Sequence, residues 1–209
     1  MIANCLHTPK GTLQFVVVAA SLLSFRRTKK EDFILKEAKK SLAMMISNET
    51  REQLNKLIAK SFSCNAQADN MCYCIGYAEY NVIEDIVHHS FAHAFPALAD
   101  ELSDLMLRLN ARPVRLDISG YGYDYEGNLE AIFADMLMMC NEYRQMIIET
   151  IDRAEMNSDY EIKIGLEEFL VKFLPYIKQV NIWLDYAKRY NGNYESFNVH
   201  FPEISSLVK

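Results

Sequence analysis

Apolar side chains recur every three to four residues along most of the chain after residue 45, which is the spacing of one face of an α-helix. The four longest such stretches cover residues 49–78, 80–110, 129–154 and 158–190. In the third stretch every step between apolar positions from Leu129 to Ala154 is of three or four residues. We therefore predict an all-α fold built from four long helices.

Local signals mark breaks and ends within these helices. Pro96 predicts a kink in the second helix, and Pro175 predicts a bend in the fourth. The run Ser158-Asp-Tyr-Glu161 has the pattern of a capping box that opens the fourth helix. Asn191-Gly192 ends that helix, and residues 201–208 can add a short final one.

The segment between the second and third helices determines the predicted topology. Residues 111–128 contain Pro113 and three glycines and show no helical period, so they form a loop. The second helix is about 45 Å long at 1.5 Å per residue, and the loop reaches roughly 55 Å when extended. A hairpin needs only about two to eight residues. We therefore expect a crossover, with the second and third helices running parallel.

Composition and charge restrict the class of protein. Half of the 209 residues are apolar and the net charge is −6, which argues against a surface that coats nucleic acid everywhere. The five cysteines are an odd number without the spacing of a disulfide framework. A reduced protein of the cytoplasm is the resulting expectation.

The first 44 residues differ from the rest. Leu13–Leu23 is an apolar run too short to span a bilayer as a helix, so no integral membrane segment is expected. Seven basic and three acidic residues follow between Arg26 and Lys40. Three interpretations of this segment compete. It is a membrane or targeting element, a basic tail that touches nucleic acid, or a stretch that precedes a true start of the protein at Met44 or Met45. We expect an extension (1–44) that is poorly ordered or outside the core, a bundle (45–190), and a C-terminal tail with a short helix (191–209).

One face of the second helix carries carboxylates and imidazoles. At 100° per residue its members fall within a sector of about 100°, opposite the apolar stripe. They are Asp85, His89, His93, Asp100 and Asp104. These residue types are the ligands of iron sites in helical bundles. The alternative is a solvated face that happens to contain histidines.

Four fragments in order resemble the ferritin superfamily. Phe91-Ala-His-Ala-Phe95 resembles the start of the ferritin second helix, and Arg112-Pro-Val-Arg-Leu-Asp-Ile118 resembles the entry into the ferritin crossover. Leu129-Glu-Ala131 is similar to the start of the third helix, and the segment from Asp159-Tyr160 to Lys172 is similar to part of the fourth. The resemblance implies a ferritin-like four-helix bundle with a long crossover loop.

The same resemblance removes the ferritin di-iron site within the bundle. On the first helix the matching ligand position falls on Asp69 or Ser61. The other four ligand positions fall on leucines, which bind no iron and fit a dry apolar centre. These are Leu102, Leu105, Leu137 and Leu174.

The DNA-protecting miniferritins (Dps) imply a different site, at a subunit interface. Their Asp-x-x-x-Glu motif is similar to Asp100-Glu-Leu-Ser-Asp104, and their upstream His and Asp fall on Asp85 and His89 in swapped order. The histidine that a partner subunit supplies falls near Tyr73, which is a departure.

These observations predict a homo-oligomeric, ferritin-like protein that binds or stores iron at a subunit interface. One alternative is a ferritin-like scaffold or interaction protein that has lost metal binding. Another is a Dps-like protein that protects DNA with the basic segment between Arg26 and Lys40.

Overall fold

The computed structural model describes residues 44–118 and 122–206. The expected N-terminal extension, including the apolar run and the basic segment between Arg26 and Lys40, lies outside the described residues except for Met44. Within the described ranges every regular element is a helix and none is a strand. The prediction of an all-α fold is confirmed for this part of the chain.

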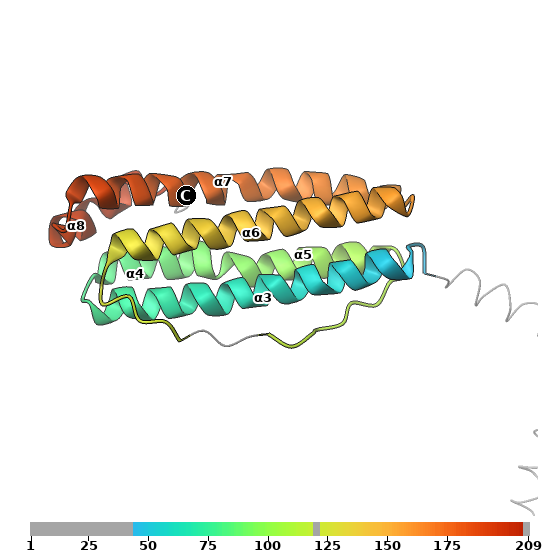
Figure 1. Cartoon of the computed structure of the whole chain (residues 1–209), viewed down its shortest axis with the longest axis horizontal. Coiled ribbons are helices and arrows are strands. Elements are labelled where there is room, and N and C mark those ends of the chain that lie inside the picture. The colour runs from blue at the N-terminus through green and yellow to red at the C-terminus, as the bar shows by residue number, and fades with distance from the viewer. Residues whose placement is uncertain (1–43, 119–121, 207–209) are drawn as a thin grey trace, which may run out of the picture. The chain divides into compact units, whose positions relative to one another are not determined.

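Four helical paths lie lengthwise beside one another (Figure 1). They are α3 (Asn48–Tyr77), the interrupted path α4 (Asn81–Val87), η1 (His88–Ala92) and α5 (Ala94–Arg108), then α6 (Leu129–Met156) and α7 (Tyr160–Tyr190). The colours of Figure 1 show that α5 and α6 run in one direction, while α3 and α7 run in the other. None of the described helices has the length and apolar character needed to span a bilayer.

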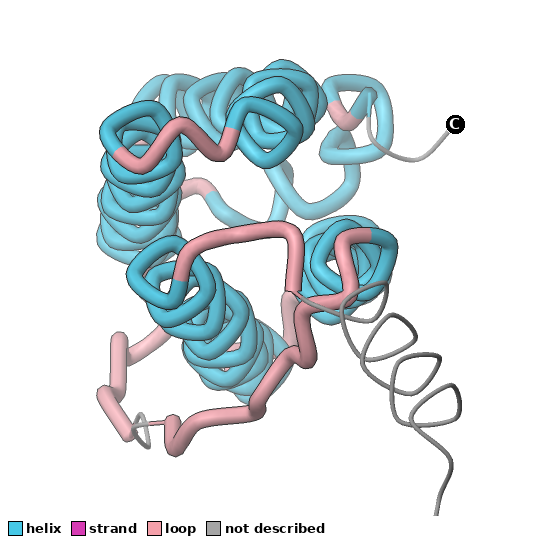
Figure 2. The backbone as a smooth tube through the Cα atoms, turned by 90° about the vertical axis from the view of Figure 1, so that its right-hand side faces the viewer, coloured by secondary structure: helices cyan, strands magenta, loops and turns pink. Residues whose placement is uncertain are grey.

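The connection between α5 and α6 runs along the outside of these helices (Figures 1 and 2). Side chains of α3 hold it in place at two points. Asn55 Oδ1 accepts a hydrogen bond from the backbone N of Val114 at 2.8 Å, and Asn70 Nδ2 donates to the carbonyl of Tyr123 at 2.7 Å. Between these points the guanidinium carbon of Arg115 lies 3.6 Å from the centre of the Phe62 ring, a cation–π contact.

The second path is not the continuous helix that the periodicity predicts. His93 N donates to the carbonyl of His88 at 3.1 Å, which is the i to i−5 bond of a π-helix. Pro96, one turn further on, has no N–H to offer the carbonyl of Ala92. Asn65 Nδ2 on α3 donates to that buried carbonyl instead, at 3.2 Å. The break therefore lies before the proline, and a tertiary contact supports it.

The predicted capping box at Ser158 is wrong. Ser158 has φ of 60°, and α7 starts at Tyr160 without a side-chain cap from Asp159. The reason is that the Asp159 carboxylate accepts hydrogen bonds from the Ser47 backbone N at 3.1 Å and from its hydroxyl at 2.7 Å. Asp159 therefore connects the start of α3 to the turn before α7.

The core extends beyond residue 190 through α8 (Tyr194–Ile204). Phe201 on α8 is fully buried and stacks on Phe133 with 6.0 Å between ring centres. Trp183 on α7 is also fully buried, and its Nε1 donates to Ser205 Oγ at 3.0 Å. Phe201 and Trp183 lie 5.2 Å apart between ring centres, so the final helix closes one end of the aromatic core.

The four leucines predicted for the bundle centre do not share one environment. Leu102 is buried and Leu105 and Leu137 are half-buried, but Leu174 is 44% exposed. Phe173 is the inward residue at that level of α7. The register taken from the ferritin fourth helix is therefore wrong by one residue, a rotation of about 100° on a helix.

Candidate functional site

The predicted site residues form two groups along the second path. Asp85, His89 and His93 belong to α4, η1 and the residue that follows, whereas Asp100 and Asp104 lie on α5. All five are exposed, as expected for a polar face. The group at η1 is the denser one.

Three imidazole rings gather at the π-helix. The His93 ring centre is 4.5 Å from that of His88 and 5.5 Å from that of His89. His89 Nδ1 lies 3.2 Å from Asp85 Oδ1 and 2.9 Å from the Asp85 carbonyl, so this pair forms a contact across one helical turn. The π-turn is wider than an α-helical turn and places residues five apart on the same side, which brings His88 and His93 together.

His88 lies between two carboxylates from different elements. Its Nε2 is 3.6 Å from Asp69 Oδ1 on α3, and its Nδ1 is 3.7 Å from Glu84 Oε1 on α4. Asp69 Oδ1 is buried and has no hydrogen bond within the described residues. His88 of η1 thus lies within ion-pair distance of one carboxylate on α3 and one on α4, so its imidazole links these two helices.

Asp69 and Glu84 also influence a neighbouring thiol. Cys72 is fully buried on α3, and burial raises the pKa of its thiol, with Asp69 and Glu84 adding to the rise. Burial likewise raises the pKa of Cys64 to about 12. Both thiols are therefore neutral at physiological pH, which makes them poor nucleophiles and poor metal ligands.

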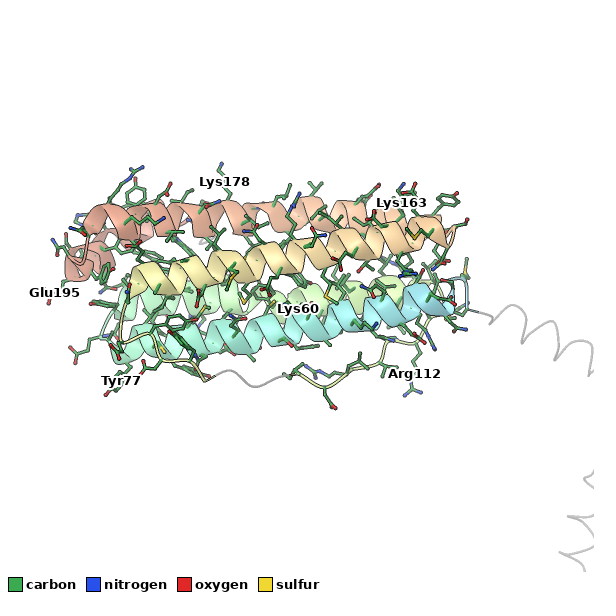
Figure 3. All side chains as sticks on the ribbon, viewed as in Figure 1. Lys60, Tyr77, Arg112, Lys163, Lys178 and Glu195 are labelled. Atoms are coloured by element: carbon green, nitrogen blue, oxygen red, sulfur yellow. The ribbon has the colours of Figure 1, made fainter. Side chains whose placement is uncertain are left out.

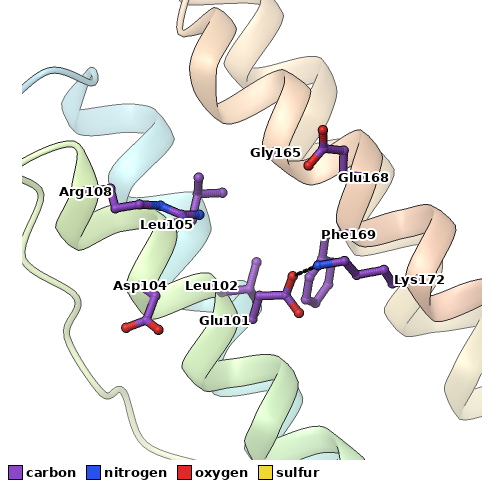
Figure 4. Close-up of a pocket in the computed structure, with 9 residues that line it drawn as sticks. All are labelled: Glu101, Leu102, Asp104, Leu105, Arg108, Gly165, Glu168, Phe169 and Lys172. Carbon is purple, nitrogen blue, oxygen red and sulfur yellow. Dashed lines mark hydrogen bonds and ion pairs between the residues drawn. The ribbon is translucent and has the colours of Figure 1, made fainter.

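Asp104 lines a cleft of about 210 Å³ between α5 and α7 (Figure 4). Lys172 of α7 forms an ion pair with Glu101 of α5 across this cleft. At Gly165 the two helices come close, since a Cβ there would lie 2.9 Å from the Leu105 methyl carbons. Asp100 is not part of this cleft; it lines a separate hollow of about 220 Å³ beside the loop after α5.

One chain therefore does not bring the five predicted residues together. The described residues contain no group of three or more His, Cys, Asp or Glu side chains that could hold a metal ion. The cluster of His88 with Asp69 and Glu84 was not predicted from the sequence. Their contacts depend on the π-turn and on packing against α3, which periodicity alone does not reveal.

A different surface was also missed. Large apolar side chains remain exposed along the outer face of α7 (Figure 3 shows this helix with all side chains). They are Tyr160 at 57%, Ile164 at 58%, Val171 at 65% and Leu174 at 44%, and we call them the outer stripe of α7. The signal was present in the sequence, because these positions lie opposite the buried Phe169, Phe173 and Val180.

Comparison with known proteins changes the functional interpretation. The family model described as herpesvirus phosphoprotein 85 (HHV6-7 U14/HCMV UL25) matches residues 29–166, about two thirds of the chain. None of the curated proteins compared with the chain matches it.

This match overturns the resemblance to ferritins and Dps proteins, and with it the predicted iron-handling and DNA-protecting functions. The fragment Phe91–Phe95, for example, combines two buried aromatic residues with the exposed His93, a combination that many helical cores share. The chain belongs to the herpesvirus phosphoprotein 85 family.

Proposed function

We propose that this chain is a helical interaction module of a herpesvirus tegument phosphoprotein. In this proposal it works by binding other proteins with its outer surface, as part of the protein assembly of the virus particle. We also propose that the chain is phosphorylated, in line with the description of the family as a phosphoprotein.

The outer stripe of α7 is the observation that carries the proposal. Isolated exposed apolar residues are common on protein surfaces. Here four of them share one side of a single helix, and three are more than half exposed. An apolar row of this kind, with charged residues beside it, is the usual composition of a helical docking face.

The scaffold beneath this surface supports the proposal. We propose that α3, the α4–η1–α5 path, α6 and α7 form one four-helix bundle with a crossover connection, held by α3 and closed by α8. The fully buried Trp183, Phe133 and Phe201 give it a rigid core. A rigid core lets an exposed helix face be presented without rearrangement.

Further features of the proposal concern where and with what the chain acts. Cys64, Cys72, Cys74 and Cys140 are free thiols, which suits a reducing compartment such as the cytoplasm. Homo-oligomerisation is part of the proposal. Contact of the segment between Arg26 and Lys40 with nucleic acid stays a prediction that falls outside the described residues.

The proposal is tested with purified virus particles that carry an epitope-tagged chain. We expect the chain to resist protease in intact particles and to be digested after detergent removes the envelope. The variant Ile164→Lys/Val171→Lys should reduce its incorporation, while Met138→Lys, at an exposed apolar position of α6, should not. Absence of the wild-type chain from particles would contradict the proposal.

A further inference from the structure

The outer face of α7 repeats with the spacing of a helix-pairing seam. One series of its exposed positions follows steps of four and three, an average of 3.5 residues, which is the repeat of a coiled coil. In order they are Tyr160, Ile164, Glu167, Val171, Leu174, Lys178, Asn181 and Asp185. Apolar residues occupy the first part of the series and polar ones the last part.

We propose that this seam pairs, antiparallel, with the same seam of a second copy of the chain. In an antiparallel pair centred between Val171 and Leu174, each Val171 faces the partner's Leu174. The same register places Glu167 opposite the partner's Lys178 and Ile164 opposite the partner's Asn181. The inference rests on the proposed interaction function and names its partner.

Charge complementarity selects this arrangement. An isologous pair repeats each contact twice, so the centre holds two Val–Leu contacts with a Glu167–Lys178 ion pair on either side. A parallel pair in register would instead place Glu167 against Glu167 and Lys178 against Lys178. Like charges at a seam disfavour that pairing.

The seam is free to pair in the single chain. Among the salt bridges of the described residues, none involves Glu167 or Lys178. The Lys178 side chain extends from α7 away from the other helices (Figure 3). The inner residues of the helix, such as Phe173 and Val180, are fully buried, so pairing does not compete with the core.

The test is sedimentation equilibrium of the full chain over a range of concentrations. Wild type should dimerise. Glu167→Lys and Lys178→Glu should each raise the dissociation constant about tenfold or more, because each creates like-charge contacts twice. The double charge reversal should restore dimerisation. Arg144→Glu, at an exposed position of α6, is the matched control and should leave the constant unchanged. Thermal unfolding followed by circular dichroism checks that each variant folds.

A wild-type chain that stays monomeric at every concentration would overturn the inference, as would a double reversal that fails to recover the dimer. The proposed function fails differently. If the stripe variant is lost from virus particles while the chain is monomeric, the interaction function stands and the partner is another protein. If the chain dimerises as expected but is absent from virus particles, the inference of a dimer is supported and the proposed function is contradicted.

Discussion

The α4–η1–α5 path and α7 both contain a proline, and the two helices respond to it differently. Pro96 leaves the Ala92 carbonyl without its helical donor in a buried place, so Asn65 supplies a hydrogen bond and a π-turn forms upstream. Pro175 likewise leaves the Val171 carbonyl without its helical donor, but α7 continues through it over its full length of 31 residues. Val171 is 65% exposed, so water can serve that carbonyl. The effect of a proline on a helix therefore depends on whether the carbonyl that it leaves without a donor is buried or exposed to water.

The same comparison separates two kinds of surface. The interrupted path gathers histidines and carboxylates whose contacts hold α4 to α3, since His88 lies between Asp69 and Glu84. The uninterrupted helix presents a regular row of apolar residues that nothing in the described chain covers. We therefore infer that the cluster of histidines and carboxylates stabilises the local structure. The outer stripe of α7 is the better candidate for binding another protein.

The largest expected effect contrasts the two faces of α7. Trp183→Ala should lower the free energy of unfolding by about 3–5 kcal/mol, because it leaves a cavity between α7 and α8 and removes the hydrogen bond to Ser205. Val171→Ala on the outer face should change it by less than about 0.5 kcal/mol. Urea unfolding at a concentration where the chain is monomeric measures both. Similar losses for the two variants would show that the outer face is part of the folding core.

Alkaline pH should destabilise the interior. Burial raises the pKa of Cys64 from 9.0 to about 12, and it raises the pKa values of Cys72 and Cys140 as well. Above pH 9 the unfolded chain loses these protons while the folded chain keeps them. The free energy of unfolding should therefore fall as pH rises, by up to about 1.4 kcal/mol per pH unit for each thiol.

Unfolding measured between pH 8 and 11 tests this, with Cys72→Ala near η1 and Cys140→Ala on α6 as the matched pair. Each substitution should make the pH dependence shallower. A dependence that neither substitution changes would mean that these thiols ionise equally in the folded and unfolded chain.

A smaller effect tests the account of the proline break. Asn65→Ala should cost about 1–2 kcal/mol, since it leaves the buried Ala92 carbonyl without a donor. Pro96→Ala restores a backbone N–H, so Asn65→Ala should cost less in that background. The four variants form a double-mutant cycle. Additive effects would show that Asn65 does not compensate for Pro96.

Helix positions were the most predictable part of the fold. The expected 49–78 and 129–154 correspond to α3 (Asn48–Tyr77) and α6 (Leu129–Met156) within two residues. Strong 3.6-residue periodicity explains this, because each helix buries one face. The π-turn was not predictable, because it depends on the contact between Asn65 and Ala92, which are distant in sequence.

The candidate site was harder to predict than the fold. Phe91 and Phe95, which carried part of the ferritin resemblance, are buried rings in edge-on contact with centres 5.3 Å apart. Such pairs occur wherever helices pack, so they indicate a core and no particular function. Leu174 was placed inside by the resemblance, although the periodicity of Phe173 and Val180 places it outside. The residue pattern of the chain itself was the better guide.

Cross-linking between two copies tests the central claim most directly. Chains carrying Val171→Cys are mixed with chains carrying Leu174→Cys and treated with a short thiol cross-linker. The antiparallel seam predicts rapid formation of the mixed dimer, much faster than for Met138→Cys, which is similarly exposed on α6. Equal rates for the α7 pair and the α6 control would contradict the account.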